Sequence, residues 1–163
     1  MGQNIIMTTQ KERLDKRREL LDSYEQSLFL PNHSPPGTEA ELQGYLNLDR
    51  TEIESLHPHQ AVSISVRLGQ FSFYFHRCLN REISNRTWAQ SELDRIVAEH
   101  SQDYSTYIKA DHKIHLVCKE NGVAAELRSI VVYAQQRIDR LSDLHSEIKN
   151  IAYLLSLLRK SKE

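Results

Sequence analysis

The sequence has few residues that interrupt helices. Its 163 residues include only 5 glycines and 4 prolines, and three of the prolines, Pro31, Pro35 and Pro36, lie within one short segment. Glycine and proline are the poorest helix formers, so their scarcity elsewhere favours an all-α protein over any β class. We therefore expect helices joined by short turns, with one Pro-rich linker over residues 30–37.

The sequence is also poor in cysteine and in long apolar runs. Cys78 and Cys118 both lie inside apolar helical patterns, which is typical of reduced core residues in a cytosolic protein. Nothing approaches 18 consecutive apolar residues, so we expect no membrane span. The first residues are polar and do not predict a signal peptide. These features predict a protein of the cytoplasm, or of the host cell cytoplasm if a phage encodes it.

Signatures of catalysis are missing as well. The sequence has no Gly-rich phosphate loop, no Gly-x-Ser-x-Gly elbow and no His-Glu-x-x-His. Among its eight histidines, His112 and His115 are three residues apart, and Asp111 is four residues before His115. No second pair and no Cys/His cluster at zinc spacing accompanies them. We therefore expect no enzymatic activity, no cofactor and no metal site.

The last quarter of the chain contains a long helical pattern. From Val123 to Lys160 the sequence has no glycine or proline, and its apolar residues recur at steps of three and four, which is the spacing of one helical stripe. At 1.5 Å per residue this helix would be roughly 55 Å long. The stripe comprises Leu127, Ile130, Ala134, Ile138, Leu141, Leu144, Ile148, Ile151, Leu155 and Leu158.

A second long helix is predicted from about His59 to about Ser101, because apolar residues again recur at steps of three and four from Ala61 to Ile96. Two such helices suit an antiparallel pair. The predicted fold is therefore an all-α, elongated helical bundle or coiled coil of two long antiparallel helices plus shorter helices, and oligomeric. We expect an N-terminal helical region over residues 1–57 and a long-helix core and oligomerisation domain over residues 58–163.

Shorter helices are predicted around this pair. One runs over residues 10–29, one from Thr38 to about Leu46, and one over residues 108–119. Thr38 is a suitable N-terminal cap, and Asp49 and Thr51 offer another start, for a short turn that ends at Leu56-His57. Pro58 suits a first turn, and Asn121 suits the cap of the last helix. The end of the last helix, beyond what its partner covers, is predicted to contact other copies through Ile148, Ile151, Leu155 and Leu158.

Aromatic residues crowd one turn of the first long helix. Phe71, Phe73, Tyr74 and Phe75 lie on more than one side of that turn. Two interpretations are open at this point. The first is that the aromatic residues are core residues, buried by two neighbouring helices. The second is that they form an exposed aromatic platform on which nucleic-acid bases stack.

Basic residues at helical spacing are the remaining signal. The net charge is −1, with an acidic excess in residues 1–60 and a basic excess in residues 109–163. Phosphates need cations and bases need flat rings, so lysines and arginines interleaved with tyrosines are typical of a single-strand groove. An ordinary solvated helix surface has the same composition. The candidate DNA-binding residues are Arg77, Arg81, Arg86, Arg95, Tyr104, Tyr107, Lys109 and Lys113.

Residues 61–160 resemble the UvsY-like phage recombination mediator family. The similar segments are Tyr74 followed by Leu79-Asn80-Arg81, Ile130-Val131-Val132-Tyr133, Arg137-Ile138-Asp139-Arg140-Leu141 and Glu147-Ile148-Lys149-Asn150. The resemblance implies a non-enzymatic homo-oligomer that binds single-stranded DNA. It also implies two protein partners, a strand-exchange recombinase that it helps to load and the single-strand-binding protein that covers the DNA. The alternative is a structural or assembly protein of a phage particle that uses the long apolar stripes and does not bind DNA.

Overall fold

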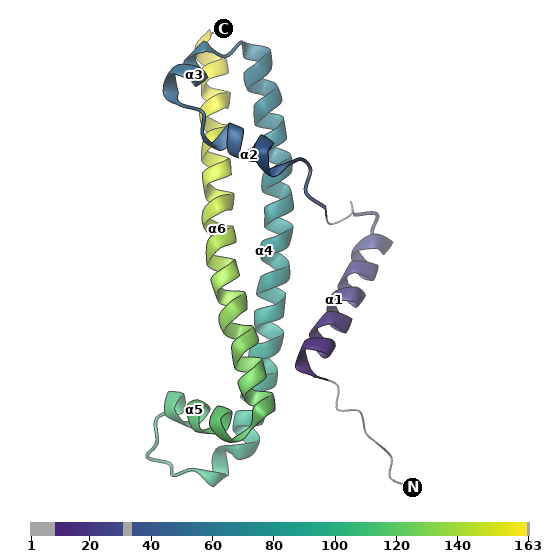
Figure 1. The fold of residues 1–163 in the computed structure, drawn as a ribbon, viewed down its shortest axis with the longest axis vertical. Helices are drawn as coiled ribbons and strands as arrows, with labels where there is room; N and C mark the ends of the chain where they lie inside the picture. The colour runs from purple at the N-terminus through teal and green to yellow at the C-terminus, as the bar shows by residue number, and fades with distance from the viewer. Residues whose placement is uncertain (1–8, 31–33, 163) are drawn as a thin grey trace. The chain divides into compact units, whose positions relative to one another are not determined.

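The computed structural model describes residues 9–30 and 34–162, with side chains as far as residue 157. Its helices are α1 (Gln10–Ser27), α2 (Glu39–Leu46), α3 (Arg50–Ser55), α4 (Pro58–His100), the 3-10 turn η1 (Ser101–Asp103), α5 (Ala110–Glu120) and α6 (Gly122–Lys162) (Figure 1). No strand occurs among the described residues, and α4 and α6 pack against each other, so the all-α prediction is confirmed. None of the described helices is long and apolar enough to cross a membrane.

The helix ends follow the predicted cap residues. Thr38 accepts a hydrogen bond from the Glu41 backbone N–H, and Asp49 begins α3 with a capping box to Glu52. Such caps satisfy amide donors that the first turn leaves without a partner. Asn121 Oδ1 likewise accepts from the first amides of α6, and Pro58 is the first residue of α4. Of the predicted linker, residues 31–33 lie outside the described residues.

The two long helices run in opposite directions. In α4, Ser65 Oγ donates to the Ala152 carbonyl of α6 at 3.4 Å. Seven residues later in α4, Ser72 Oγ is 3.0 Å from Nδ1 of His145, which is seven residues earlier in α6. A forward step in one helix therefore matches a backward step in the other, as the antiparallel prediction requires. The repeat of seven is the spacing of a coiled-coil seam.

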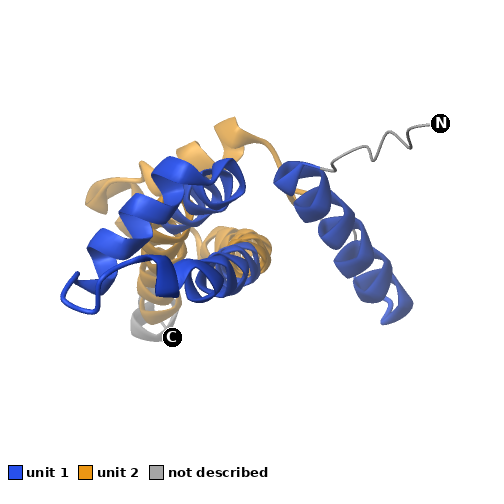
Figure 2. Cartoon of the chain, turned by 90° about the horizontal axis from the view of Figure 1, so that it is seen from below, with its two compact units in different colours: residues 1–32, 83–135 blue, residues 33–82, 136–163 orange. Residues whose placement is uncertain are grey.

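The chain divides into two compact units that do not follow the predicted boundary at residue 57 (Figure 2). Unit 1 comprises residues 1–32 and 83–135, and unit 2 comprises residues 33–82 and 136–163. Each long helix therefore contributes one part to each unit. The N-terminal region over 1–57 stays a prediction; within the units, α1 bonds to residues 84–92 of α4, whereas α2 and α3 pack on the cluster around Leu68.

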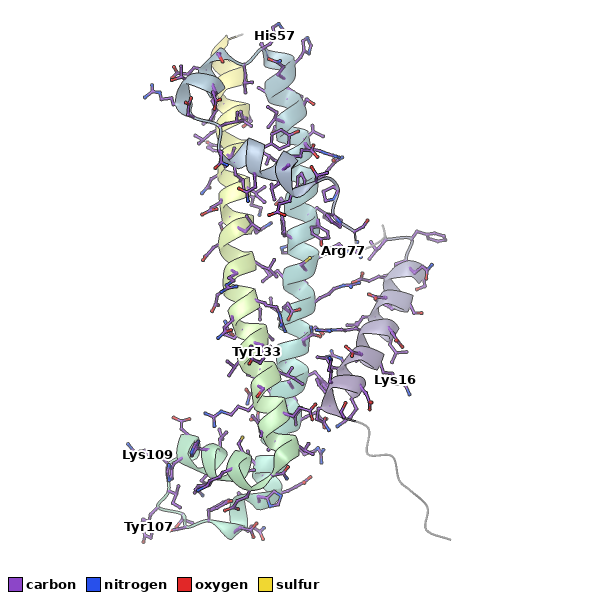
Figure 3. All side chains as sticks on the ribbon, in the orientation of Figure 1. Lys16, His57, Arg77, Tyr107, Lys109 and Tyr133 are labelled. Atoms are coloured by element: carbon purple, nitrogen blue, oxygen red, sulfur yellow. The ribbon has the colours of Figure 1, made fainter. Side chains whose placement is uncertain are left out.

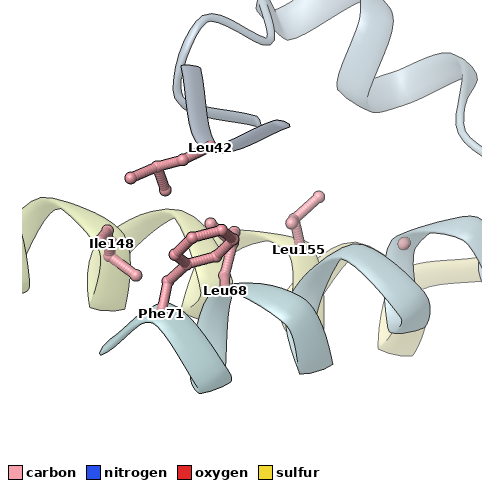
Figure 4. Packing of buried hydrophobic residues seen from close by; sticks show 6 residues of the cluster. Leu42, Leu68, Phe71, Ile148 and Leu155 are labelled. Atoms are coloured by element: carbon pink, nitrogen blue, oxygen red, sulfur yellow. The ribbon is translucent and has the colours of Figure 1, made fainter. Parts of the chain in front are cut away.

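Unit 2 has a core of large aliphatic and aromatic side chains. Leu68, Ile148 and Leu155 are at most 1% exposed, and Phe71 is 2% exposed. Helix α2 lies across α4 and α6 and inserts Leu42 between them (Figures 1 and 4). Burying each of these side chains contributes about 1.5–3 kcal/mol of transfer free energy. The short helices α2 and α3 therefore serve as a cover for one side of the long pair.

Unit 1 has a core in which small residues alternate with larger ones. Ala89 and Ala124 are fully buried beside Leu93, Val117 and Leu127. Small side chains let helix backbones approach closely, and here they seat α5 against α4 and α6. Asn85 is also buried in this unit, 2% exposed, and no described group accepts a hydrogen bond from its Nδ2.

Helix α1 is held on unit 1 by its first half. The Glu126 carboxylate accepts bonds from the Gln10 and Lys11 backbone amides, Arg13 pairs with Glu92 at 3.3 Å and stacks on Trp88, and Arg17 donates to Ser84. Arg13 and Arg17 thus bind α4, whereas Arg18 pairs with Asp15 of its own helix at 3.3 Å. Its second half has no such cover, and Leu20, Tyr24 and Leu28 are more than half exposed.

Candidate nucleic-acid interface

The predicted DNA-binding residues do not all belong to one unit. Arg77 and Arg81 lie in the unit 2 part of α4, whereas Arg86, Arg95, Tyr104, Tyr107, Lys109 and Lys113 all belong to unit 1. The sequence placed them in one series because they follow one another along the chain. The structure groups four of them, from Tyr104 to Lys113, in the loop before α5 and its first turn.

Two of the predicted arginines are engaged by neighbouring side chains. Arg95 donates to Glu99 at 2.8 Å and to Glu92 at 3.2 Å, and these hydrogen bonds raise the pKa of Arg95 above its usual range. Arg86 donates to the Gln135 side chain. Two carboxylates therefore neutralise the charge of Arg95, which makes it a poor contact for a phosphate group.

Tyr104 is held by its own unit. Its hydroxyl donates to Glu120 at 2.6 Å, and its ring packs against the buried cluster of α4, α5 and α6. The bond to the carboxylate, together with partial desolvation, raises the pKa of Tyr104 to about 12. A ring in this position fixes the loop to α5 and is partly buried against that cluster. We therefore assign Tyr104 a role in positioning the loop.

Tyr107 lies three residues further along the same loop and is 96% exposed. Lys109 is the residue before α5, is exposed and makes no side-chain capping bond, and Figure 3 shows both residues at the same end of unit 1. Lys113 follows one turn later and is half-buried. A tyrosine ring open on both faces beside lysines is the arrangement that base stacking and phosphate contact require. Of the predicted set, this group fits a single strand best.

The unit 2 part of α4 has a different charge pattern. Between Glu54 and Glu82 the chain contains no Asp or Glu, and the segment includes Arg67, Arg77 and Arg81. Arg67 forms an ion pair with Glu41 of α2 at 2.8 Å, and its hydrogen bond lowers the pKa of Glu41. Arg77 and Arg81 are half-buried and both make contacts within the chain. Their contact with DNA stays a prediction.

The aromatic residues of the turn around Phe73 fit both interpretations, some as core residues and one as an exposed ring. Phe71 is buried in the unit 2 core and Phe75 packs against the same cluster. Phe73 points away from that cluster and is 54% exposed. The core interpretation therefore holds for Phe71 and Phe75, whereas Phe73 remains accessible to a ligand.

A cluster that the sequence reasoning missed lies between α4 and α6 in unit 2. The rings of His76 and His145 have centroids 5.2 Å apart, and Ser72 bonds to His145. Lys149 follows His145 by one helical turn. Sequence spacing predicts neighbours within one helix only. The contact between His76 and His145 could be found only from the register of the two antiparallel helices. The absence of acids between Glu54 and Glu82 was the one feature of the sequence that could have pointed to this cluster.

The predicted oligomer contacts are corrected in part. Ile148 is 0% exposed and Leu155 is 1% exposed, because both pack against Leu68 and Leu42 in the core of their own unit. Ile151 is half-buried against the same cluster, and the Leu158 side chain lies outside the described residues. The same part of α6 exposes Tyr153, Leu154 and Leu157, which are further candidates for a contact with another copy.

The described part of the chain contains no metal-ligand cluster, and unit 2 has a shallow depression. The described residues contain no group of three or more His, Cys, Asp or Glu that could hold a metal ion. His112 and His115 lie 6.3 Å apart, ring centroid to ring centroid, on α5. A shallow depression of about 420 Å³ in unit 2 is lined by Glu41, Tyr45, Ser63, Val66, Arg67 and Gln70. Its charged groups already bond to one another.

Comparison with known proteins gives no assignment for the chain: no family model, no curated protein and no solved structure matches it.

Proposed function

We propose that this chain is a non-enzymatic protein that binds single-stranded DNA and assists recombinase loading, as a recombination mediator of the UvsY-like type. The observation that carries the proposal is Tyr107, a tyrosine 96% exposed on a loop that Tyr104 fixes to α5, next to exposed Lys109. A ring with this exposure on an anchored loop is open to contact by a base. Stacking a base on it would contribute about 1–3 kcal/mol.

In the proposed mechanism the protein binds the strand and catalyses no reaction. Tyr107 stacks on a base while Lys109 and Lys113 contact flanking phosphates. One loop of this size gives weak binding, so several copies acting on one strand supply the affinity. The proposed partners are single-stranded DNA, other copies of the chain, a recombinase and a single-strand-binding protein, in the cytoplasm of the host cell. Arg77 and Arg81 are retained as further candidate phosphate contacts.

Fluorescence anisotropy with a labelled single strand tests the proposal. We expect binding at low salt with an affinity that falls as salt rises, because phosphate contacts release counterions. Tyr107→Ala should weaken binding by roughly fivefold or more. Tyr133→Ala is the matched control, since Tyr133 is also exposed in unit 1 but lies on α6, away from the loop (Figure 3). No binding at low salt, or equal loss in the two variants, would overturn the proposal.

A second candidate is a structural or assembly role, and the second half of α1 favours it. Leu20, Tyr24 and Leu28 recur at every fourth residue and are 65%, 62% and 52% exposed. Phe29 follows with a positive φ of 56° and 96% exposure, a costly conformation for a bulky residue. An exposed apolar patch of this kind marks a protein contact.

Solution mass by light scattering separates the two roles. If assembly is the function, Leu20→Gln with Tyr24→Gln should reduce the mass and leave any strand binding per chain unchanged. Arg18→Gln, a change at a polar residue of the same helix, is the control. An unchanged mass in the double variant would remove the specific support for an assembly role.

A further inference from the structure

The strongest unassigned feature lies where α4 and α6 meet in unit 2. His76 and His145 face each other with ring centroids 5.2 Å apart and an interplanar angle of 38°. Ser72 Oγ lies 3.0 Å from His145 Nδ1, and Ser72 itself is only 8% exposed. One nitrogen of the His145 ring is therefore held by a buried hydroxyl, which fixes the orientation of the ring.

A third group that can carry positive charge belongs to the same face. Lys149 is four residues after His145, and residues with this spacing lie one above the other on a helix. Burial, then the charge of Lys149, then His76, lowers the pKa of His145. Lys149 and His76 thus both act on the ring, and no carboxylate offsets them.

The acidic residues closest in sequence to these groups lie on other faces of their helices or are already bound. On α6, Glu147 is two residues from both His145 and Lys149, which places it about 200° around the helix. Asp143 is displaced from His145 in the same way, and on α2 the Glu41 carboxylate is bound by Arg67. On α4 the other titratable neighbours of His76 are Tyr74, Arg77 and Cys78, none of them an acid that is ionised at pH 7.

We propose that Ser72, His76, His145 and Lys149 form a binding site for a tetrahedral oxyanion, such as a phosphate or sulfate group. The two imidazoles and the ammonium group donate hydrogen bonds, the hydroxyl orients one ring, and no carboxylate competes for the donors. A metal ion fits less well, because the Lys149 charge repels a cation. The inference goes beyond the proposed function, since it concerns unit 2 and requires no nucleic acid.

The site responds to pH. As the pH falls toward the pKa of His145, its imidazole gains a proton and a charge, so anion binding strengthens. Without an anion the same protonation is unfavourable. The pKa of His145 in the folded chain is below its usual value of 6.5, so the unfolded chain binds more protons in that range. Stability in a buffer without oxyanions therefore falls as the pH drops below about 6.5.

Sulfate is the probe for the first test, because it keeps its charge between pH 5.5 and 7.5. Sulfate is added to the full chain at constant ionic strength, with chloride as the balancing salt, and the His145 ring is followed by NMR. We expect sulfate to raise the pKa of His145 and to bind at least about threefold more tightly at pH 5.5 than at pH 7.5. Chloride alone should do neither.

Variants separate this site from a general effect of sulfate. Lys149→Gln changes an exposed residue and should reduce the sulfate-induced pKa shift by at least half, and His76→Gln should do the same. The double variant His112→Gln/His115→Gln is the control, because it removes the histidine pair of α5, which stands beside Asp111. No shift of the His145 pKa by sulfate, or an equal shift in Lys149→Gln, would overturn the proposal.

A short oligothymidylate identifies the source of the oxyanion. If the strand also raises the pKa of His145 and competes with sulfate, the ligand is a nucleic-acid phosphate. If sulfate and inorganic phosphate act and the strand does not, the ligand is a free oxyanion. Both results support the site. A third result is that the protein does not bind the strand but sulfate still raises the pKa of His145. That result would contradict the proposed function and leave this site in place.

Discussion

The two units share the same pair of long helices and differ in the number of acids that their α4 segments contain. In unit 1, the α4 segment contains Glu92, Asp94 and Glu99, and the first and last of these neutralise Arg95. In unit 2, the α4 segment has no acid between Glu54 and Glu82. A count of lysines and arginines therefore says little about anion binding. The position of the nearest carboxylate decides whether a cation remains available to a ligand.

The units also differ in how their cores are packed, and the largest expected effects test that difference. Leu68 in unit 2 and Leu127 in unit 1 are both 0% exposed. Leu68→Ala should lower the free energy of unfolding by about 2–5 kcal/mol, because it leaves a cavity among large side chains. Chemical denaturation measures this change. Leu154→Ala, at a residue 52% exposed, is the control, and a cost as small as that of the control would contradict the described core.

The small residues of unit 1 predict the opposite kind of sensitivity. Ala89 is 0% exposed where α4 meets α5 and α6. Ala89→Leu should destabilise the protein by about 1–3 kcal/mol through overpacking. Ala98→Leu, at an exposed position of the same helix, should have little effect. Equal denaturation midpoints for the two variants would show that α5 does not pack closely on α4.

Asn85 offers a change in the stabilising direction. Its amide is buried and no described group accepts from Nδ2, which carries an unfavourable desolvation free energy. Asn85→Leu should therefore raise the free energy of unfolding, by about 1 kcal/mol. Thermal unfolding of the wild type and the variant checks this. A clear loss of stability would mean that the Asn85 amide has a partner in solution.

The smallest expected change concerns the titration of Tyr104. Its pKa is raised to about 12, so the ionisation of this ring should extend to about pH 12 when ultraviolet absorbance is followed with rising pH. The hydrogen bond to Glu120 favours the protonated ring, so its contribution to stability is present below the usual pKa of about 10 and is lost as the pH rises through 12. Glu120→Gln should bring the titration back toward 10, and a pKa near 10 in the wild type would contradict the contact.

Much of the fold follows from the sequence, because it depends on local rules. The steps of three and four predicted both long helices, and Thr38, Pro58 and Asn121 marked helix starts where the structure has them. The two-unit division did not follow, since it depends on which part of α4 each short helix contacts. Ile148 and Leu155 were assigned to a neighbour for the same reason: their stripe was visible, but the cover supplied by α2 was not.

The candidate site was predictable in composition and not in arrangement. The sequence pattern predicted Tyr107 and Lys109 as DNA contacts together with Tyr104 and Arg95, which are likewise a tyrosine and a basic residue. Only side-chain contacts separate them, because Glu120 holds Tyr104 and two glutamates hold Arg95. His76 and His145 are 69 positions apart in the chain, and the helix register alone brings them together.

The central claim is that Tyr107 stacks on bases of a single strand, and a tryptophan at that position tests it most directly. Tyr107→Trp places a fluorophore on the loop, against a constant background from the single native Trp88. We expect an oligothymidylate to quench the added fluorescence in a saturable, salt-dependent manner, and to leave Tyr133→Trp unquenched. No quenching at low salt, or the same quenching in both variants, would contradict the claim.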